Sequence, residues 1–412
     1  MNTLHRKKFL PLLLSLLGCG MPAVAVAEQE DPAALVMTGL DNYEENIKAQ
    51  WALWPYFDES IVWHTDWTRW YPNATVKEHF RAYRDLGPDV TKKFSTLHTN
   101  TYFYEDERGT VANCGAMCGP WELDKEDPRS SSPYGIIHPS RDYMRTINFQ
   151  DRSLIWMPKD LPTAENPSRA GMELFLGDGE FLRVSIGIAY DAAGPLSQVS
   201  VLREDTRDFG LFWSGTDATP TAAPELTKHT TTQEKQSALD DFWFTDFPDD
   251  GAYGGLHVSV PGLEQSTTFD SSSLWLGNGM SLDTILPWDD ITVFEVPDDG
   301  IVIVCPNRLP ATDEDWFEVA VAWKKADGTW AAAIEAVYEN GTMSHVDYIT
   351  IPDNLAPAPT ESAADADADV DVDVDVESVA ADYDDSSASR NISLRWHGTL
   401  VAMSMVVMSM LA

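Results

Sequence analysis

Short apolar runs that alternate with polar residues, separated by acidic or glycine-bearing turns, constrain this chain more than any other feature. From residue 182 to residue 189, Leu, Val and Ile stand at the even positions, whereas the odd positions hold Arg, Ser, Gly and Ala. A period of two is typical of a β-strand that buries one face. The dipeptide Asn340-Gly341, between two such runs, is a strong hairpin signal. The pattern therefore predicts antiparallel strands joined by tight turns.

The strand-like runs fall into two series of similar size. The first series follows Trp63 and comprises residues 94–104, 110–123, 142–149, 153–157, 173–176, 181–190 and 196–203. The second comprises residues 256–260, 273–276, 291–296, 300–306, 316–323, 330–339 and 342–351. One helix is expected before the first strand, within residues 32–54. Many short antiparallel strands indicate a sandwich or barrel, so we expect an all-β fold formed by duplication, with a seam near residues 209–215.

The N-terminus has the three zones of a secretory signal peptide. Arg6, Lys7 and Lys8 make it basic, residues 9–17 are apolar, and a small-residue cleavage site precedes Glu28. We therefore predict a signal peptide over residues 1–27. A bacterial lipoprotein signal, with Cys19 as the acylated residue, is the alternative.

The C-terminus has the order of residues expected for a glycosylphosphatidylinositol (GPI) anchor. Residues 361–385 hold eleven acids and no base, which predicts an extended acidic stalk over residues 353–386. Weak calcium binding by this stalk is conceivable, although it lacks a rigid ligand loop. Ser386 begins a run of small residues, followed by a polar spacer and an apolar end, so it is the expected attachment residue and 387–412 the removed signal. The expected location is the cell surface through a membrane lipid anchor, and secretion is the alternative.

The cysteines and glycosylation sequons fit an oxidising compartment. Cys114 and Cys118 are close enough to form a disulfide, and without a second cysteine or histidine pair they do not indicate a zinc site, so no metal is expected. Cys305 follows an apolar run and is expected to be buried. Asn73 and Asn340 lie in Asn-x-Thr sequons and are the predicted glycosylation sites.

Composition excludes some functions. The formal charge is −38, and residues 28–360 alone carry −32, so binding to nucleic-acid phosphates is not expected. Hydrophobic residues make up 43% of the chain, which is ample for a folded core. The sequence has no nucleophile elbow, glycine-rich phosphate loop or HExxH helix. We therefore expect neither a cofactor nor an identifiable enzyme activity.

Several blocks resemble a known family. They are Trp63–Pro72, Leu182–Asp205, Trp213–Gly215 and Gly300–Trp323. Over residues 50–351 their order resembles an uncharacterised family of photosynthetic microbes built from two tandem lipocalin-like (calycin) barrels. The resemblance implies a helix and first barrel within residues 28–207, a second barrel within 208–352, and a ligand cavity.

The candidate ligand-binding residues are aromatic or charged and lie in the predicted strands: Trp63, His64, Trp67, Arg69, Arg145, Arg183, Arg203 and Glu204. Arginines that point into a barrel need partners, since an unpaired buried charge is strongly disfavoured. Either Glu173 and Glu204 pair with them, or a ligand carboxylate does.

The expected function is binding of a small apolar or acidic ligand such as a pigment, a tetrapyrrole or a lipid. An isomerase or lyase acting on such a ligand is one alternative, and it would use His64 or Glu204. An acidic structural or adhesive protein of the cell surface is the other.

Overall fold

The computed structural model describes residue 40 and residues 42–103, 119–163, 167–192, 194–207, 222–242, 254–267, 288–312, 316–326 and 328–350. The chain divides into two units, residues 1–360 and 361–412, and all described residues belong to the first. The signal peptide, the stalk, the anchor signal, the pair Cys114–Cys118 and the seam all lie outside the described residues. Within the described ranges, no helix has both the length and the apolarity needed to cross a membrane.

The first sheet is antiparallel and has eleven strands, in the order β4-β3-β2-β1-β11-β10-β9-β8-β7-β6-β5. Its strands are β1 (Ile61–Trp70), β2 (Val76–Pro88), β3 (Ser95–Phe103), β4 (Trp121–Asp124), β5 (Ser131–Ser132), β6 (Gly135–Ile137), β7 (Met144–Asn148), β8 (Leu154–Pro158), β9 (Ala170–Asp178), β10 (Leu182–Tyr190) and β11 (Leu196–Asp205). Helix α2 (Tyr43–Ala52) precedes it, within the range predicted for a helix. Short 3₁₀ turns lie at Pro55–Phe57, Pro128–Ser130 and Gln150–Arg152.

The second sheet is also antiparallel and has eight strands, in the order β12-β15-β16-β17-β18-β19-β13-β14. Its strands are β12 (Thr227–His229), β13 (Gly254–Ser259), β14 (Glu264–Ser266), β15 (Ile291–Val296), β16 (Ile301–Pro306), β17 (Phe317–Lys324), β18 (Trp330–Glu339) and β19 (Thr342–Thr350). Helix α3 (Thr232–Phe242) was not predicted, and 3₁₀ turns lie at Trp288–Asp290 and Pro297–Asp299. The expected mostly-β fold with a short N-terminal helix is confirmed, whereas closure of either sheet into a barrel stays a proposal.

The predicted Asn-Gly hairpin joins β18 to β19. Glu339 pairs with Thr342 across the turn. Asn340 and Gly341 have φ values of 52° and 72°, the left-handed conformation that a two-residue hairpin turn of type I′ requires. Asparagine and glycine tolerate this conformation better than other residues, which is why the sequence signal was reliable here.

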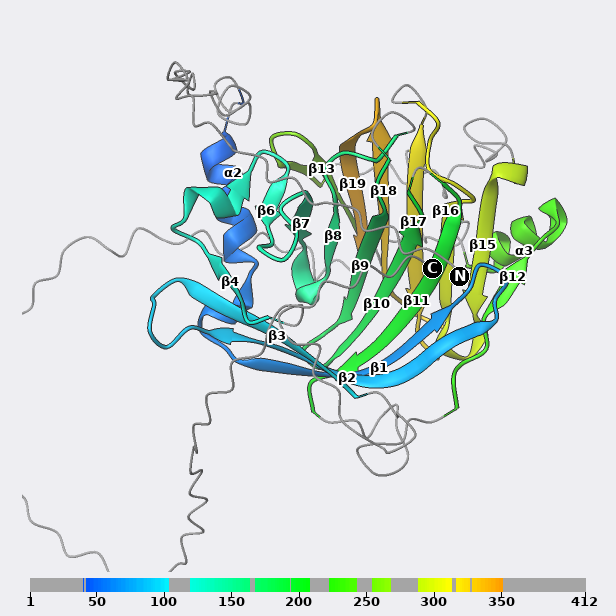
Figure 1. Cartoon of the computed structure of the whole chain (residues 1–412), viewed down its shortest axis with the longest axis horizontal. Coiled ribbons are helices and arrows are strands. Elements are labelled where there is room, and N and C mark those ends of the chain that lie inside the picture. Colours follow the sequence, from blue (N-terminus) through cyan, green and yellow to red (C-terminus); the bar gives the residue numbers. More distant parts are fainter. Residues whose placement is uncertain are drawn as a thin grey trace, which may run out of the picture. The chain divides into compact units, whose positions relative to one another are not determined.

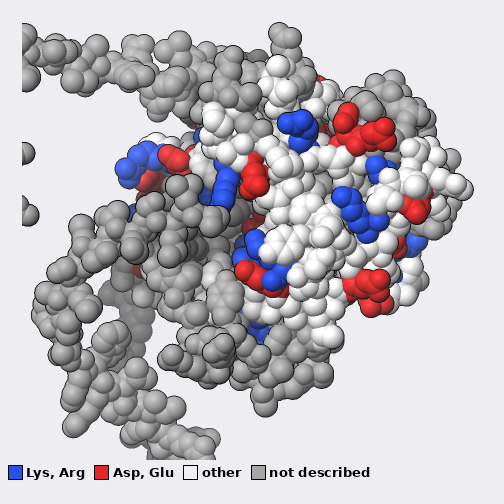
Figure 2. Space-filling model, turned by 45° about the vertical axis from the view of Figure 1, so that its right-hand side comes forward, with Lys and Arg blue, Asp and Glu red and all other residues white. Residues whose placement is uncertain are grey.

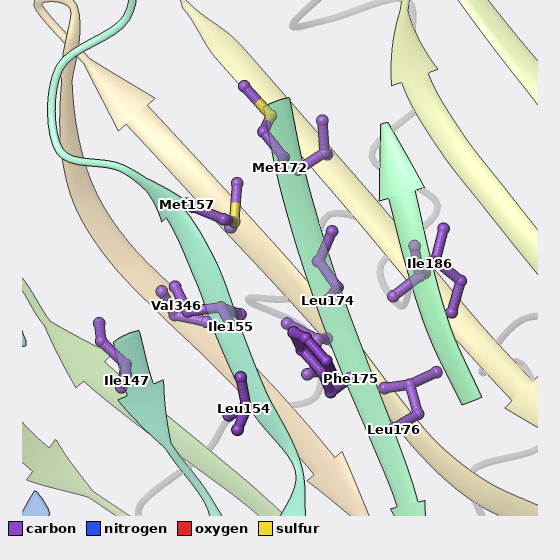
Figure 3. Packing of buried hydrophobic residues seen from close by; sticks show 14 of the residues in the cluster. Ile147, Leu154, Ile155, Met157, Met172, Leu174, Phe175, Leu176, Ile186 and Val346 are labelled. Carbon is purple, nitrogen blue, oxygen red and sulfur yellow. The ribbon is translucent and has the colours of Figure 1, made fainter. Parts of the chain in front are cut away.

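The core lies between the two sheets (Figures 1 and 3). The apolar even positions of β10 supply Val184, Ile186 and Ile188, all buried. Figure 3 shows Leu174 on neighbouring β9 together with Ile186, and Val346 of β19 close to the first sheet. Burying such side chains stabilises a fold by about 1.5–3 kcal/mol each, so this face of β10 contributes substantially to the stability of the core.

Polar contacts also join the sheets. The Tyr338 hydroxyl donates to the Pro158 carbonyl at 2.7 Å, and the Tyr190 hydroxyl donates to the Pro306 carbonyl at 2.9 Å. Cys305 is fully buried beside Tyr190, as predicted, and burial raises the pKa of its thiol to about 12. These tyrosines fill the interface and satisfy their hydroxyls at the same time.

The first sheet curves so that strands near its opposite ends approach each other. The pairing order places β3 one strand from one end and β6 one strand from the other, yet His98 of β3 lies 3.0 Å from His138, which follows β6. Helix α2 and the residues after it connect both ends, because Trp51 donates to Ser131 at 2.9 Å and Trp54 donates to Thr96 at 3.2 Å. Figure 1 shows β1 to β3 running across the direction of β9 to β11.

Acidic and basic side chains are interspersed on the face shown in Figure 2. Several described pairs bring the two signs together, such as Lys92 with Glu122 at 2.8 Å and Arg129 with Asp127 at 2.7 Å. Exposed pairs of this kind contribute about 0–1 kcal/mol each, so they shape the surface more than they stabilise it.

Candidate functional site

The curved first sheet encloses a cavity of about 490 Å³. Its aromatic lining consists of Trp54, Tyr56, Trp67, Tyr102, Trp121, Trp156 and Phe175. Its charged and polar lining includes Arg69, Arg84, His98, Asn100, His138, Ser140, Arg141, Glu173, Arg183, Gln198 and Ser200.

The odd positions of β10 explain part of this cavity. Gly187 and Ala189 line it, so this end of the strand's inner face presents almost no side-chain volume to the interior, whereas Arg183 extends a long side chain from the same face. Space is tight behind Gly187, where an added Cβ would lie 2.3 Å from the Ser200 hydroxyl oxygen. Small residues at this end of the inner face of β10 therefore leave room for the cavity, while Val184 and Ile186 of its other face belong to the hydrophobic core.

Two arginines and two glutamates form a buried ion-pair network at the cavity wall. Glu204 accepts from Arg183 Nε at 2.6 Å and from Arg84 Nη1 at 3.3 Å. Arg84 Nη1 also donates to Glu173 at 2.8 Å. Burial alone would raise the pKa of Glu204, but the two guanidinium groups hold it below its usual range. The network is neutral overall, so it needs no ligand charge.

The Arg183 guanidinium is further enclosed by aromatic rings. It lies 4.1 Å from the ring centre of Trp63 and 4.8 Å from that of Phe175. Cations over ring faces are stabilised by the ring quadrupole, most strongly where water is excluded. Trp63 therefore packs against the Arg183 side chain without lining the cavity itself.

Two histidines form a hydrogen-bonded chain across the cavity. The Ser140 backbone N–H donates to His138 Nδ1 at 3.2 Å, which leaves His138 Nε2 to donate to His98 Nδ1 at 3.0 Å. His98 Nε2 then donates to Asn100 Oδ1 at 3.0 Å. Each ring is neutral in this arrangement, and every ring nitrogen has a partner.

The electrostatic surroundings of these two histidines disfavour general-base catalysis. Burial, together with Arg84 and Arg141, lowers the pKa of His138 to about 3, and burial also holds the pKa of His98 well below its usual value. The Ser140 hydroxyl lies 2.7 Å from His138 Nδ1. A base whose pKa lies so far below neutral is poorly matched to general-base catalysis at neutral pH. The hydrogen-bonded histidines are better suited to orienting a ligand.

Two more arginines line the cavity. Arg69 pairs with Glu78 at 2.7 Å and stacks on Trp67, whose ring centre lies 4.6 Å away. Arg141 is exposed, lies 5.5 Å from the ring centre of Trp156, and pairs with no carboxylate among the described residues. Of the four arginines that line the cavity, Arg141 alone brings an unbalanced positive charge within the described part of the chain.

The sequence-predicted candidates divide between the two faces of the first sheet. Trp67, Arg69 and Arg183 line the cavity, and Glu204 lies directly behind it. His64 projects from the other face of β1 and packs edge-on against Tyr83.

Arg145 and Arg203 also lie away from the cavity lining. Arg145 donates to the backbone carbonyls of Asp142 and Met144. Arg203 pairs with Asp66 and with Asp299, which lies in the turn between β15 and β16 of the second sheet.

The most important residue that sequence reasoning missed is Arg84. It lies in β2, which was not predicted because residues 76–88 are rich in charge. A signal was nonetheless present, since the apolar residues Phe80, Ala82 and Leu86 recur with a period of two, and Arg84 stands in the same phase. His98 had no comparable signal, because its partner is forty residues away in sequence.

The fold and cavity define a class of protein: an antiparallel β protein whose curved first sheet encloses an aromatic, arginine-bearing cavity. Residues 49–209, which contain all of the described cavity lining, match the N-terminal domain of DUF3598, a domain of unknown function.

Two solved structures are similar to the chain. One is a DUF3598 protein of unknown function from the cyanobacterium Nostoc punctiforme, with 14% identity and a TM-score of 0.41, covering 73% of this chain and 97% of that chain. The other, provisionally described as AttH from Nitrosomonas europaea, has 10% identity and a TM-score of 0.17, covering 72% and 69% of the two chains. No curated protein matches the chain. The matching DUF3598 domain and the DUF3598 structure are both of unknown function.

Proposed function

We propose that the first sheet forms a lipocalin-like barrel that binds a small, mainly apolar ligand bearing an acidic group. The observation that carries this proposal is the cavity of about 490 Å³ with its aromatic lining. Small-molecule sites are usually concave, mostly apolar and about 300–1,000 Å³ in volume, with a few polar groups that fix orientation. A pigment, a tetrapyrrole and a lipid are the candidate classes.

The acidic group follows from charge balance. Arg84 and Arg183 are neutralised by Glu173 and Glu204, and Arg69 is neutralised by Glu78. That leaves the exposed guanidinium of Arg141 as the anchor for a ligand carboxylate, which it can bind with two parallel hydrogen bonds. The apolar part of the ligand would then lie among the tryptophans, within reach of the neutral histidine chain.

Fluorescence titration with an anionic apolar dye, anilinonaphthalene sulfonate, followed by displacement with a fatty acid, tests the proposal. The protein should bind one dye per cavity, and the fatty acid should displace it. Arg141→Met should weaken dye binding by about tenfold or more, because it removes one charge-assisted hydrogen bond and its contribution to the binding free energy.

Arg129→Met is the matched control, because the Arg129 side chain is 90% exposed and lies outside the cavity lining. It should leave the dye affinity unchanged. Absence of saturable binding, or equal affinities in the two variants, would contradict the proposal.

We further propose that the protein is exported and tethered to the cell surface, with the second sheet as a second barrel. The three-zone N-terminus, the small residues from Ser386 and the apolar C-terminal run support this location. Phosphatidylinositol-specific phospholipase C should release the protein from intact cells. A mature protein that retains a peptide ending at Ala412 would overturn the anchor.

A further inference from the structure

Two histidines and an aspartate meet on one face of the second sheet, and none of them lines the cavity. His257 of β13 pairs directly with Asp347 of β19. His345 stands two residues before Asp347 on the same strand, so the two side chains leave β19 on the same face. One nitrogen or oxygen from each residue lies within 4.8 Å of those of the other two.

The two histidines approach the two oxygens of one carboxylate. His257 Nδ1 lies 2.7 Å from Asp347 Oδ1, and His345 Nε2 lies 3.8 Å from Asp347 Oδ2. Ligand atoms on a tetrahedral zinc ion, with bonds of about 2.0–2.2 Å, are separated by about 3.4 Å. Since all three ligand atoms lie within 4.8 Å of one another, shifts of about 1.4 Å or less in each separation would admit the ion.

The far nitrogens of both rings already have hydroxyl partners. His257 Nε2 lies 3.2 Å from Ser259 Oγ, and His345 Nδ1 lies 2.9 Å from Ser344 Oγ. Histidines that bind metals typically hydrogen-bond through the second ring nitrogen, which fixes the tautomer and aims the first nitrogen at the ion. Both rings thus turn their remaining nitrogen toward Asp347 in the way a metal site requires.

A buried carboxyl group, that of Glu335, lies next to Asp347 in the sheet, outside the group of three, and interacts with the Glu318 carboxyl group. Glu335 of β18 is directly opposite Asp347 in the strand register, so both side chains lie on the same face. Glu335 is 4% exposed, and its Oε2 has no hydrogen-bond partner within the described residues. An oxygen buried without a partner is costly unless another group satisfies it.

We propose that His257, His345 and Asp347 form a binding site for one divalent transition-metal ion of the zinc class, with Glu335 beside it. Two imidazoles and one carboxylate suit zinc, cobalt or nickel, whereas calcium and magnesium prefer all-oxygen sites. Three protein ligands leave a fourth position open to water or a substrate. The side chains of His257 and His345 are 35% and 23% exposed, so an ion can reach them.

Calorimetric titration with zinc tests this site in the full chain, purified without a histidine tag. Excess calcium in the buffer occupies weak carboxylate sites, which matters in a chain of charge −38. One zinc ion should bind per chain. Cobalt, used as a coloured substitute in a second titration, should give a visible spectrum that reports nitrogen ligands.

His257→Gln and His345→Gln keep a polar side chain but remove the imidazole, and each should weaken zinc binding by at least about tenfold. Asp347→Asn should weaken it similarly. His229→Gln is the matched control, because His229 of the same sheet pairs with Glu295 outside the cluster and should not affect zinc binding. Circular dichroism of the metal-free variants confirms that each folds. No zinc binding, or the same affinity in the three site variants as in the control, would overturn the site.

Discussion

Glu204→Gln tests the buried ion-pair network of the cavity wall most sharply. Glu204 is fully buried, and it accepts from Arg183 at 2.6 Å, from Ser185 at 2.7 Å and from Arg84 at 3.3 Å. Glutamine keeps the shape but removes the charge, so two guanidinium groups would share the single carboxylate of Glu173. Removing one partner of a buried pair costs about 3–5 kcal/mol, because it leaves an uncompensated buried charge.

Urea unfolding followed by tryptophan fluorescence at pH 7 measures this cost. A loss of about 3–5 kcal/mol is large against a total stability of about 5–15 kcal/mol. Glu78→Gln is the control, because it removes the partner of Arg69, but its side chain is 39% exposed. Its expected cost is about 0–1 kcal/mol.

A double variant separates charge from shape. Arg183→Met combined with Glu204→Gln leaves Arg84 and Glu173 as a balanced pair, so it should be more stable than Glu204→Gln alone. Coupled neighbours commonly show interaction energies of about 0.5–3 kcal/mol. If Glu204→Gln lowers the free energy of unfolding no more than Glu78→Gln does, the buried ion-pair network does not stabilise the fold.

Three further outcomes are expected. The pKa of His138 is about 3 in the folded protein, below the value of about 6.5 in the unfolded chain. Between these pH values the unfolded chain binds more protons than the folded one, so the free energy of unfolding decreases as pH falls from 6.5 toward 3. His138→Asn lacks this pH dependence. The difference in the free energy of unfolding between the wild type and His138→Asn should therefore decrease on acidification, by up to about 1.4 kcal/mol per pH unit, and a difference independent of pH would contradict this. Iodoacetamide should label Cys305 only after denaturation, because the thiol is fully buried, and rapid labelling of the native protein would be the contrary result. Asn73 and Asn340 are both exposed, so a glycosidase specific for N-linked glycans should lower the apparent mass of the exported protein, and an unchanged mass would count against glycosylation.

Strand periodicity predicted much of the fold where one face of a strand is apolar. The alternation in β10 separated the core-facing Ile186 from Arg183, which lines the cavity. The Asn-Gly turn fixed the β18–β19 hairpin for a local reason, its positive φ values. In both cases the information is contained within a few consecutive residues.

Features that depend on sheet curvature could not be read from the sequence. His98 and His138 meet because strands near opposite ends of the first sheet approach each other. His257 and Asp347 meet across β13 and β19, although they are ninety residues apart. Strand pairing of this range is set by the whole sheet, and no local pattern encodes it.

The most direct test of ligand binding is native mass spectrometry of the protein expressed in its own organism. Ala189→Trp places a large side chain on the cavity lining, whereas Ala192→Trp makes the same substitution in an exposed turn three residues away. The wild type and Ala192→Trp should each retain one small molecule that is absent from Ala189→Trp. A wild-type protein that carries no ligand, or an Ala189→Trp variant that retains the same ligand, would contradict the proposed function.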